Sequence, residues 1–306
     1  MPSGIIMKGI GGFYYVLSGE VLYECKARGI FRKNGITPLP GDEVEISIQD
    51  EEKNIGSVDV ILPRKTLLVR PAVANIDQII AVMAVTSPEP DFLLLDKLLV
   101  TAGKDDINAV VCINKIDLDD TGKSGRIAEE YGRAGYRVIL TSSIKDIGFD
   151  ELKDALHGRI TVFAGQSGVG KSTLLNRIMD AFVMKTGILS GKIERGKHTT
   201  RHAELIPLVD GGYLVDTPGF SSFELAGIEY ANLKDYFREF AGTGKECRFK
   251  GCSHINEPDC AVKEAVSSGT VETGRYERYI TLFGLLKQVD DMKYKKSGKE
   301  KEKKQC

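Results

Sequence analysis

The chain has 306 residues, of which 42% are hydrophobic and 28% are charged, and its formal net charge is −1. The length predicts two or three domains, and the composition is typical of a folded globular protein. A near-neutral charge excludes a uniform polycation, so any nucleic-acid binding must come from local patches. No segment reaches the roughly 18 apolar residues of a membrane span. The first residues lack the pattern of a secretory signal, so we expect a cytoplasmic protein that does not enter the membrane.

Residues 1–70 contain short runs in which apolar and polar residues alternate, such as GFYYVLS and DEVEISI. Turn-forming residues separate these runs. Several short strands without a helical pattern predict a small β-barrel, and an OB-fold is the favoured type. An SH3-like barrel and an irregular β cap are the alternatives.

Residues 71–227 have a different sequence pattern, in which apolar strand-like runs alternate with helical ones. IDQIIAVMAV and NAVVCIN are strand-like, whereas DFLLLDKLLVTAG has helical spacing. This alternation predicts an α/β domain with a parallel sheet covered on both faces. Two strand-like runs around residues 210–212 predict a hairpin near its end.

The segment 228–292 has a helical pattern that is interrupted by a cysteine-rich loop, and it predicts a small α-helical domain. Residues 293–306 contain seven lysines and two glutamates, which is a local charge balance of +5. This lysine-rich composition predicts a disordered tail.

The stretch GQSGVGKS, residues 165–172, matches the phosphate-loop pattern G-x-x-x-x-G-K-S. It follows an apolar strand and precedes a helical run, which is the context that the motif requires. Backbone N–H groups of such a loop surround the β-phosphate, Lys171 reaches the β- and γ-phosphates, and the Ser172 hydroxyl binds Mg²⁺. The alternative is a chance glycine-rich turn. The predicted phosphate-binding residues are Gly165, Gln166, Ser167, Gly168, Val169, Gly170, Lys171, Ser172 and Thr173.

The stretch NKID, residues 114–117, predicts that the base is guanine. The Asp117 carboxylate can accept hydrogen bonds from N1–H and the 2-amino group, and adenine offers no such pair of donors. Asn114 is expected to hold the loop and the base edge, while the stem of Lys115 covers the ring. Thr141, Ser142 and Ser143 follow the run YRVIL and suit a backbone contact to the guanine carbonyl. A surface loop is the alternative for NKID, because this motif is short.

Four further residues are candidates for the rest of the predicted site. Asp216 ends an apolar run and is expected to hold Mg²⁺ through water, and the Gly219 N–H is expected to sense the γ-phosphate. Thr199 and Thr200 are both candidates for the switch residue that closes on Mg²⁺, and Thr200 is preferred.

Phe220 stands where many GTPases have glutamine, and an apolar ring cannot orient the attacking water. We therefore expect slow intrinsic hydrolysis, with another group or a partner completing the site. His198, which precedes the two switch threonines, is the nearest candidate in sequence for this group. The predicted catalytic residues are His198, Lys171 and Thr200. The alternative is that His198 lies in a solvated loop.

The order of these motifs is unusual, because the base-reading stretch precedes the phosphate loop. Cutting a closed α/β domain at a surface loop and joining its old ends leaves the core contacts intact, so the order indicates a circular permutation. It also connects the Gly219 switch directly to the C-terminal domain, which we expect to respond to the γ-phosphate.

The cysteine-rich loop predicts a metal site. Three cysteines and one histidine fall within 14 residues in the pattern C-x4-C-x-H-x5-C. This donor set matches a closed, tetrahedral and structural Zn²⁺ site. A chance cluster of buried thiols is the alternative, and the lack of a C-x-x-C pair disfavours a redox role. The predicted ligands are Cys247, Cys252, His254 and Cys260.

The permuted motifs NKID, GQSGVGKS, GKHTT and DTPGF, followed by the cysteine and histidine cluster, resemble the ribosome small-subunit-dependent GTPase A family (RsgA, also called YjeQ or YloQ). The resemblance extends nearly from end to end. It implies an OB-fold, a permuted GTPase domain and a zinc domain. It further implies binding to the 30S subunit and its 16S rRNA, stimulation of GTP hydrolysis by that subunit, and a role in its late maturation. We expect a monomer.

Residue types alone give modest support for RNA binding, because a small barrel can present aromatic and basic side chains to RNA. The alternative is that about half of them are core aromatics and the rest form a solvated face. Two other functions stay open: a GTP-gated RNA-binding scaffold, and a nucleic-acid-binding module that has lost its GTP chemistry. The candidate RNA-contacting residues are Phe13, Tyr14, Tyr15, Lys26, Arg28, Arg32 and Lys33.

Overall fold

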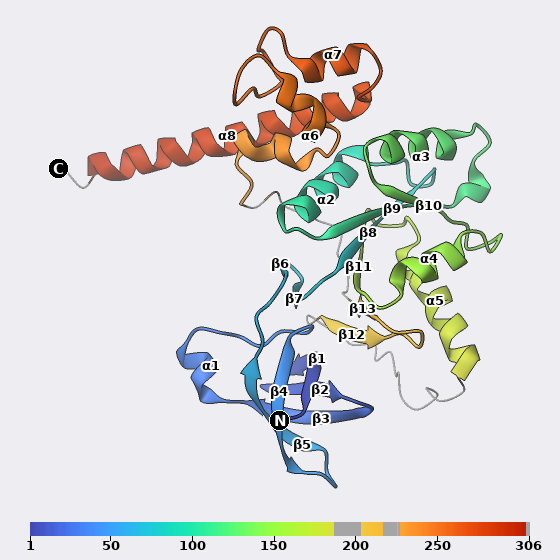
Figure 1. Cartoon of the computed structure of the whole chain (residues 1–306), viewed down its shortest axis with the longest axis vertical. Helices are drawn as coiled ribbons and strands as arrows, with labels where there is room; N and C mark the ends of the chain where they lie inside the picture. The colour runs from blue at the N-terminus through green and yellow to red at the C-terminus, as the bar shows by residue number, and fades with distance from the viewer. Residues whose placement is uncertain (187–202, 217–224, 226, 304–306) are drawn as a thin grey trace.

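A computed structural model describes residues 1–186, 203–216, 225 and 227–303 of the chain. Three parts follow one another along the sequence (Figure 1): a β-barrel, an α/β domain built on one sheet, and a helical part at the C-terminal end. None of the helices that the structure describes combines the length and apolar character needed to cross a membrane.

The N-terminal part is a closed barrel with the strand order β1-β2-β3-β5-β4, in which β3 and β5 run parallel. A short helix, α1 (Gly29–Lys33), lies between the third and fourth strands. Alternate side chains such as Val16, Val44 and Val58 fill its interior. This strand order and helix position confirm the barrel and its OB-like type. The strands are β1 (Ser3–Ile10), β2 (Phe13–Ser18), β3 (Val21–Ala27), β4 (Glu43–Asp50) and β5 (Ile55–Ile61).

A short hairpin, β6 (Leu67–Val69) and β7 (Ala72–Ala74), connects the barrel to the sheet. The Arg64 guanidinium donates from Nε and Nη2 to the two carboxylate oxygens of Asp42, at 2.7 and 2.8 Å. Asp42 is fully buried, so this pair fixes the linker to the barrel. The sequence-based boundary after residue 70 falls inside the hairpin.

The central sheet has six strands in the order β10-β9-β8-β11-β13-β12, and only β12 is antiparallel to its neighbour. All seven residues of β8 are buried, as expected for a strand covered on both faces. The predicted hairpin around residues 210–212 is confirmed as the β12–β13 connection. The strands are β8 (Gln78–Ala84), β9 (Asn108–Asn114), β10 (Arg137–Leu140), β11 (Ile160–Ala164), β12 (Glu204–Pro207) and β13 (Tyr213–Asp216).

Two apolar layers, one on each face of the sheet, explain why the predicted α/β architecture forms. Ile79, Ala81 and Met83 of β8 pack with α2 and α3, whereas the intervening residues pack with α4 and α5. The phosphate-loop strand β11 lies between β8, which precedes it in sequence, and β13, which follows it. The helices of this domain are α2 (Phe92–Lys104), η1 (Ile116–Leu118), α3 (Lys123–Arg133), α4 (Phe149–Leu156) and α5 (Lys171–Thr186).

The C-terminal part is helical around a third apolar cluster, which includes Leu233, Phe237 and Tyr279. Its last helix, α8, packs against this part with its first turns, and its C-terminal end projects away from the rest of the chain (Figure 1). The composition of residues 293–306 predicts disorder, whereas α8 continues to Lys303. Lysine and glutamate are good helix formers, which accounts for the difference. The elements are η2 (Tyr230–Tyr236), α6 (Phe240–Thr243), η3 (Gly244–Glu246), α7 (Ala261–Ser267) and α8 (Thr273–Lys303).

Candidate nucleotide site and metal centre

The phosphate-loop sequence lies between the end of β11 and the start of α5, as its motif requires. At two positions of this loop, close contacts leave room only for glycine. Gly165 has φ +146°, and a Cβ there would lie 2.0 Å from the carbonyl oxygen of Val82. Gly170 has φ +97°, and a Cβ there would lie 2.4 Å from the side-chain nitrogen of Asn114. A side chain at either position would force the loop away from β8 or from the NKID segment.

Lys171, the first residue of α5, curls back over the loop. Its Nζ donates to the carbonyl oxygens of Gly165 and Gln166, at 2.7 and 2.8 Å. Burial lowers the pKa of this ammonium. These contacts hold the positive charge at the centre of the loop, where a phosphate is bound in sites of this type.

Asn114 joins the phosphate loop to the two segments that were predicted to read the base. Its Nδ2 donates to the carbonyl oxygen of Val169 at 2.9 Å, and its Oδ1 accepts from the Thr141 hydroxyl at 3.0 Å. Both Asn114 and Thr141 are buried. One side chain therefore fixes the relative positions of segments that lie 55 and 27 residues from it in sequence.

Lys115 makes a second connection between the same segments. Its Nζ donates to the carbonyl oxygen of Gly168 at 2.7 Å and also to that of Ser87. Its backbone is left-handed, with φ +62°, which is uncommon for a lysine and is typical of constrained functional positions. Sequence reasoning missed the Ser87 contact, because a backbone carbonyl carries no residue-type signal.

Asp117 is held by the turn that follows β10. The Ser142 hydroxyl donates to Asp117 Oδ1 at 2.5 Å and accepts from the backbone N–H of Lys145 at 3.1 Å. The carboxylate is partly exposed, and it lies on the side of the sheet where β9 and β10 end. Ligands bind at this edge in open parallel sheets.

Asp216 lies at the same edge as the phosphate loop. Val162 of β11 pairs with Val215 of β13 in parallel register. Asp216, the next residue of β13, therefore lies beside the end of β11 that leads into Gly165. Asp216 is exposed. The other residues predicted for the switches and for catalysis lie outside the described residues: His198, Thr199, Thr200, Gly219 and Phe220.

The structure brings the four predicted metal ligands together, and their ligand atoms all lie within 4.8 Å of one another. The Cys247 and Cys260 sulfurs are 3.9 Å apart. His254 Nδ1 lies 3.5 and 3.4 Å from these two sulfurs. Tetrahedral Zn²⁺ with Zn–S bonds of about 2.3 Å and Zn–N bonds of about 2.0 Å separates such atoms by roughly 3.5–3.8 Å. The cluster therefore fits zinc in donor chemistry and in spacing.

The loop that carries the four predicted metal ligands, residues 247–260, is called the metal loop. Side chains from η2 and α8 donate hydrogen bonds to three successive backbone carbonyls in it. Lys234 Nζ donates to Cys252 O at 2.9 Å. The Tyr279 and Tyr276 hydroxyls donate to Ser253 O and His254 O, at 2.5 and 2.7 Å. The loop thus rests on the first turns of α8.

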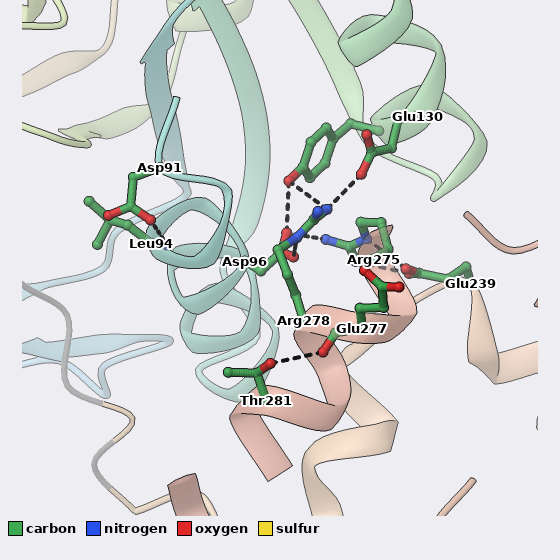
Figure 2. A network of polar contacts seen from close by, with 10 residues as sticks. Asp91, Leu94, Asp96, Glu130, Glu239, Arg275, Glu277, Arg278 and Thr281 are labelled. Carbon is green, nitrogen blue, oxygen red and sulfur yellow. Dashed lines mark hydrogen bonds and ion pairs between the residues drawn. The ribbon is translucent and has the colours of Figure 1, made fainter. Parts of the chain in front are cut away.

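Two arginines in the same turns contact the α/β domain (Figure 2). Arg275 Nη1 and Arg278 Nε each donate to one carboxylate oxygen of Asp96 on α2, both at 2.5 Å. Asp96 also accepts from the Tyr131 hydroxyl at 2.9 Å. Glu239 and Glu130 complete the cluster by pairing with Arg275 and Arg278, respectively. Residues 275–279 therefore connect the metal loop to the α/β domain.

Two family models match the chain. The RsgA GTPase model covers residues 61–226, and the RsgA N-terminal domain model covers residues 3–56. A protein from Ruminiclostridium cellulolyticum named "Small ribosomal subunit biogenesis GTPase RsgA" is 57% identical over 300 residues, which are 97% of this chain and 98% of that protein. A second protein of the same name, from Alkaliphilus metalliredigens, is 50% identical over 94% of this chain and 99% of its own length.

Two solved structures have the same fold. The crystal structure of YjeQ from Thermotoga maritima superposes with a TM-score of 0.81 at 38% identity, covering 93% of this chain and 98% of that chain. The structure of YloQ, described as a circularly permuted GTPase, gives a TM-score of 0.78 at 40% identity, covering 94% and 96%. Sequence motifs, motif order, fold and relatives agree, and the chain belongs to the RsgA GTPase family.

Proposed function

We propose that the chain binds GTP and GDP with Mg²⁺ between the phosphate loop and the NKID segment, and that it hydrolyses GTP during biogenesis of the small ribosomal subunit in the cytoplasm. The observation that carries this proposal is the direct bonding of Asn114 and Lys115 to the carbonyls of Val169 and Gly168. Because the two segments are bonded to each other, the base-reading residues and the phosphate-binding residues can contact the same nucleotide. The names of the relatives support the ribosomal partner.

Each part of the proposed nucleotide site has its own role. Backbone N–H groups of residues 165–173 and the Lys171 ammonium bind the phosphates, as in other phosphate loops. Ser172, Asp216 and Thr200 act on the Mg²⁺ side, with Thr199 as the alternative to Thr200. Asp117 reads the guanine edge. The contact to the guanine carbonyl comes from the backbone at Thr141 and Ser142.

Turnover is proposed to depend on a partner. The glutamine that orients water in many GTPases is replaced here by Phe220, so intrinsic hydrolysis is slow and the 30S subunit completes the site. His198 is the proposed water-orienting group of this chain. The protein is proposed to act as a monomer.

The barrel is proposed to contact 16S rRNA through one face of β1, β2 and β3. Lys26 Nζ lies 5.2 Å from the ring centre of Phe13, and Lys8 Nζ lies 5.4 Å from that of Tyr15. Paired cationic and aromatic side chains suit bases and phosphates. Tyr14 packs against the barrel core, so it is less suited to this role than the sequence predicts. Arg28 pairs with Asp59 at 2.8 Å, while Arg32 and Lys33 are exposed on α1.

Steady-state GTP turnover, measured at fixed salt with and without purified 30S subunits, tests the proposal. We expect slow turnover by the protein alone and an increase of roughly 10-fold or more with 30S subunits, because a partner that completes the site contributes large rate factors. Lys171→Ala should remain slow in both conditions. Stimulation by 50S and not by 30S subunits would contradict the proposed partner.

A further inference from the structure

The barrel lies against β12, the antiparallel edge strand of the central sheet (Figure 1). Ile5 and Leu17 of the barrel pack against the apolar cluster that contains Leu205 of β12. Beside this contact, Lys8 Nζ on β1 donates to Glu204 Oε1 on β12 at 2.9 Å. The two side chains are 29% and 44% exposed, so the ion pair is partly shielded from water. It joins the barrel to the α/β domain.

Glu204 is the residue of β12 that lies directly opposite Asp216 of β13. Directly opposed residues of antiparallel strands project from the same face of the sheet, with their Cβ atoms about 5 Å apart, and two like charges placed in this way repel each other. Asp216 is the carboxylate proposed for the Mg²⁺ side of the nucleotide site. The Lys8 ammonium therefore compensates a negative charge that lies next to the Mg²⁺ side.

A second contact holds Lys8 on the barrel. Lys8 and Tyr15 are cross-strand partners in β1 and β2, and Lys8 Nζ lies 5.4 Å from the centre of the Tyr15 ring. The Tyr15 hydroxyl donates to Glu24 on β3 at 3.0 Å, which fixes the ring to the barrel. The position of the ammonium thus follows the barrel and not the sheet, so Glu204 is compensated while the barrel rests on β12.

We propose that Lys8 is a positioning residue that couples the barrel to Mg²⁺ binding, an inference that rests on the proposed nucleotide function. While the ion pair is formed, Glu204 adds little net charge to the Mg²⁺ side. When the ammonium leaves, the carboxylate opposite Asp216 is uncompensated, and its negative charge attracts the divalent cation. A partner that takes Lys8, or that draws the barrel away from β12, therefore strengthens Mg²⁺ binding and slows the release of GDP.

The Mg²⁺ dependence of GDP release tests this coupling. The release rate of fluorescent mant-GDP is measured over a range of free Mg²⁺ concentrations, and the concentration that gives half of the slowing is compared among variants. Lys8→Met should lower this concentration by roughly 5-fold, as expected for one unit charge about 8 Å from a divalent cation in water. Lys8→Arg, which keeps the charge, should match the wild type. In the Glu204→Gln background, Lys8→Met should change the concentration by less than about 2-fold, because the ammonium has lost its anchor on β12.

Lys53→Met is the matched control, because Lys53 pairs with Asp50 within the barrel at 3.3 Å and is 72% exposed. It should leave the Mg²⁺ dependence unchanged. A Lys8→Met variant with the Mg²⁺ dependence of the wild type would overturn the coupling, and so would an equal effect of Lys8→Met with and without Glu204→Gln. Release of GDP that does not respond to Mg²⁺ in the wild type would instead contradict the proposed nucleotide function.

Discussion

Replacing Asp117 with Asn is expected to transfer the nucleotide preference of the protein from guanine to xanthine. A carboxylate can accept two hydrogen bonds from guanine, whereas an amide offers one acceptor and one donor. Xanthine has a C2 oxygen in place of the 2-amino group, so it matches the amide. For guanine, one charge-assisted hydrogen bond becomes a donor–donor mismatch and the other becomes a weaker neutral one, which predicts a loss of GDP affinity of about 100-fold or more. Competition between GDP and xanthosine diphosphate measures the exchange.

Asp120→Asn is the matched control for this substitution. Asp120 is an exposed carboxylate three residues further along the chain, so the same chemical change there should leave the GDP affinity unaltered. An Asp117→Asn variant that still prefers GDP would show that this carboxylate does not read the base.

Asp96→Ala is expected to release the C-terminal domain from the α/β domain. Asp96 is fully buried and is the shared acceptor for Arg275 and Arg278, and Arg275 is only 1% exposed. Removing the carboxylate leaves buried guanidinium charge that is only partly compensated by Glu239 and Glu130. Breaking a buried pair in this way costs about 3–5 kcal/mol of folding free energy. Denaturant unfolding of the full chain, followed by tyrosine fluorescence, measures the loss.

Glu277→Ala is the control, because Glu277 lies on the same helix as the two arginines (Figure 2) and is exposed. It should change the free energy of unfolding by less than about 0.5 kcal/mol, as is usual for surface positions. A loss below about 1 kcal/mol for Asp96→Ala would show that the cluster does not hold the two domains together.

The sequence is most informative where a local pattern carries the chemistry. The phosphate loop, NKID and the four metal ligands are each defined by spacing within a few residues, and their strand and helix contexts follow from apolar periodicity. The β12–β13 hairpin could likewise be predicted from its glycine pair. The order of motifs then implied the permutation, because parallel strands keep their neighbours however the chain is connected.

Contacts between distant segments could not be predicted in the same way. Asp96 lies in the run DFLLLDKLLVTAG, where it looks like the polar face of a helix, and its partners lie 179 and 182 residues further on. The carbonyl of Ser87 that binds Lys115 has no sequence signature at all. The ion pair of Lys8 with Glu204, 196 residues further on, likewise depends on how the barrel packs on β12.

Hydrogen–deuterium exchange of the backbone amides with and without GDP and Mg²⁺ tests the central claim most directly, namely that separate chain segments form one guanine nucleotide site. We expect GDP to slow exchange in residues 163–173 and in residues 114–117 together, with the change in both segments following the same binding curve. Slower exchange in 163–173 with none in 114–117 at saturating GDP would contradict a shared site.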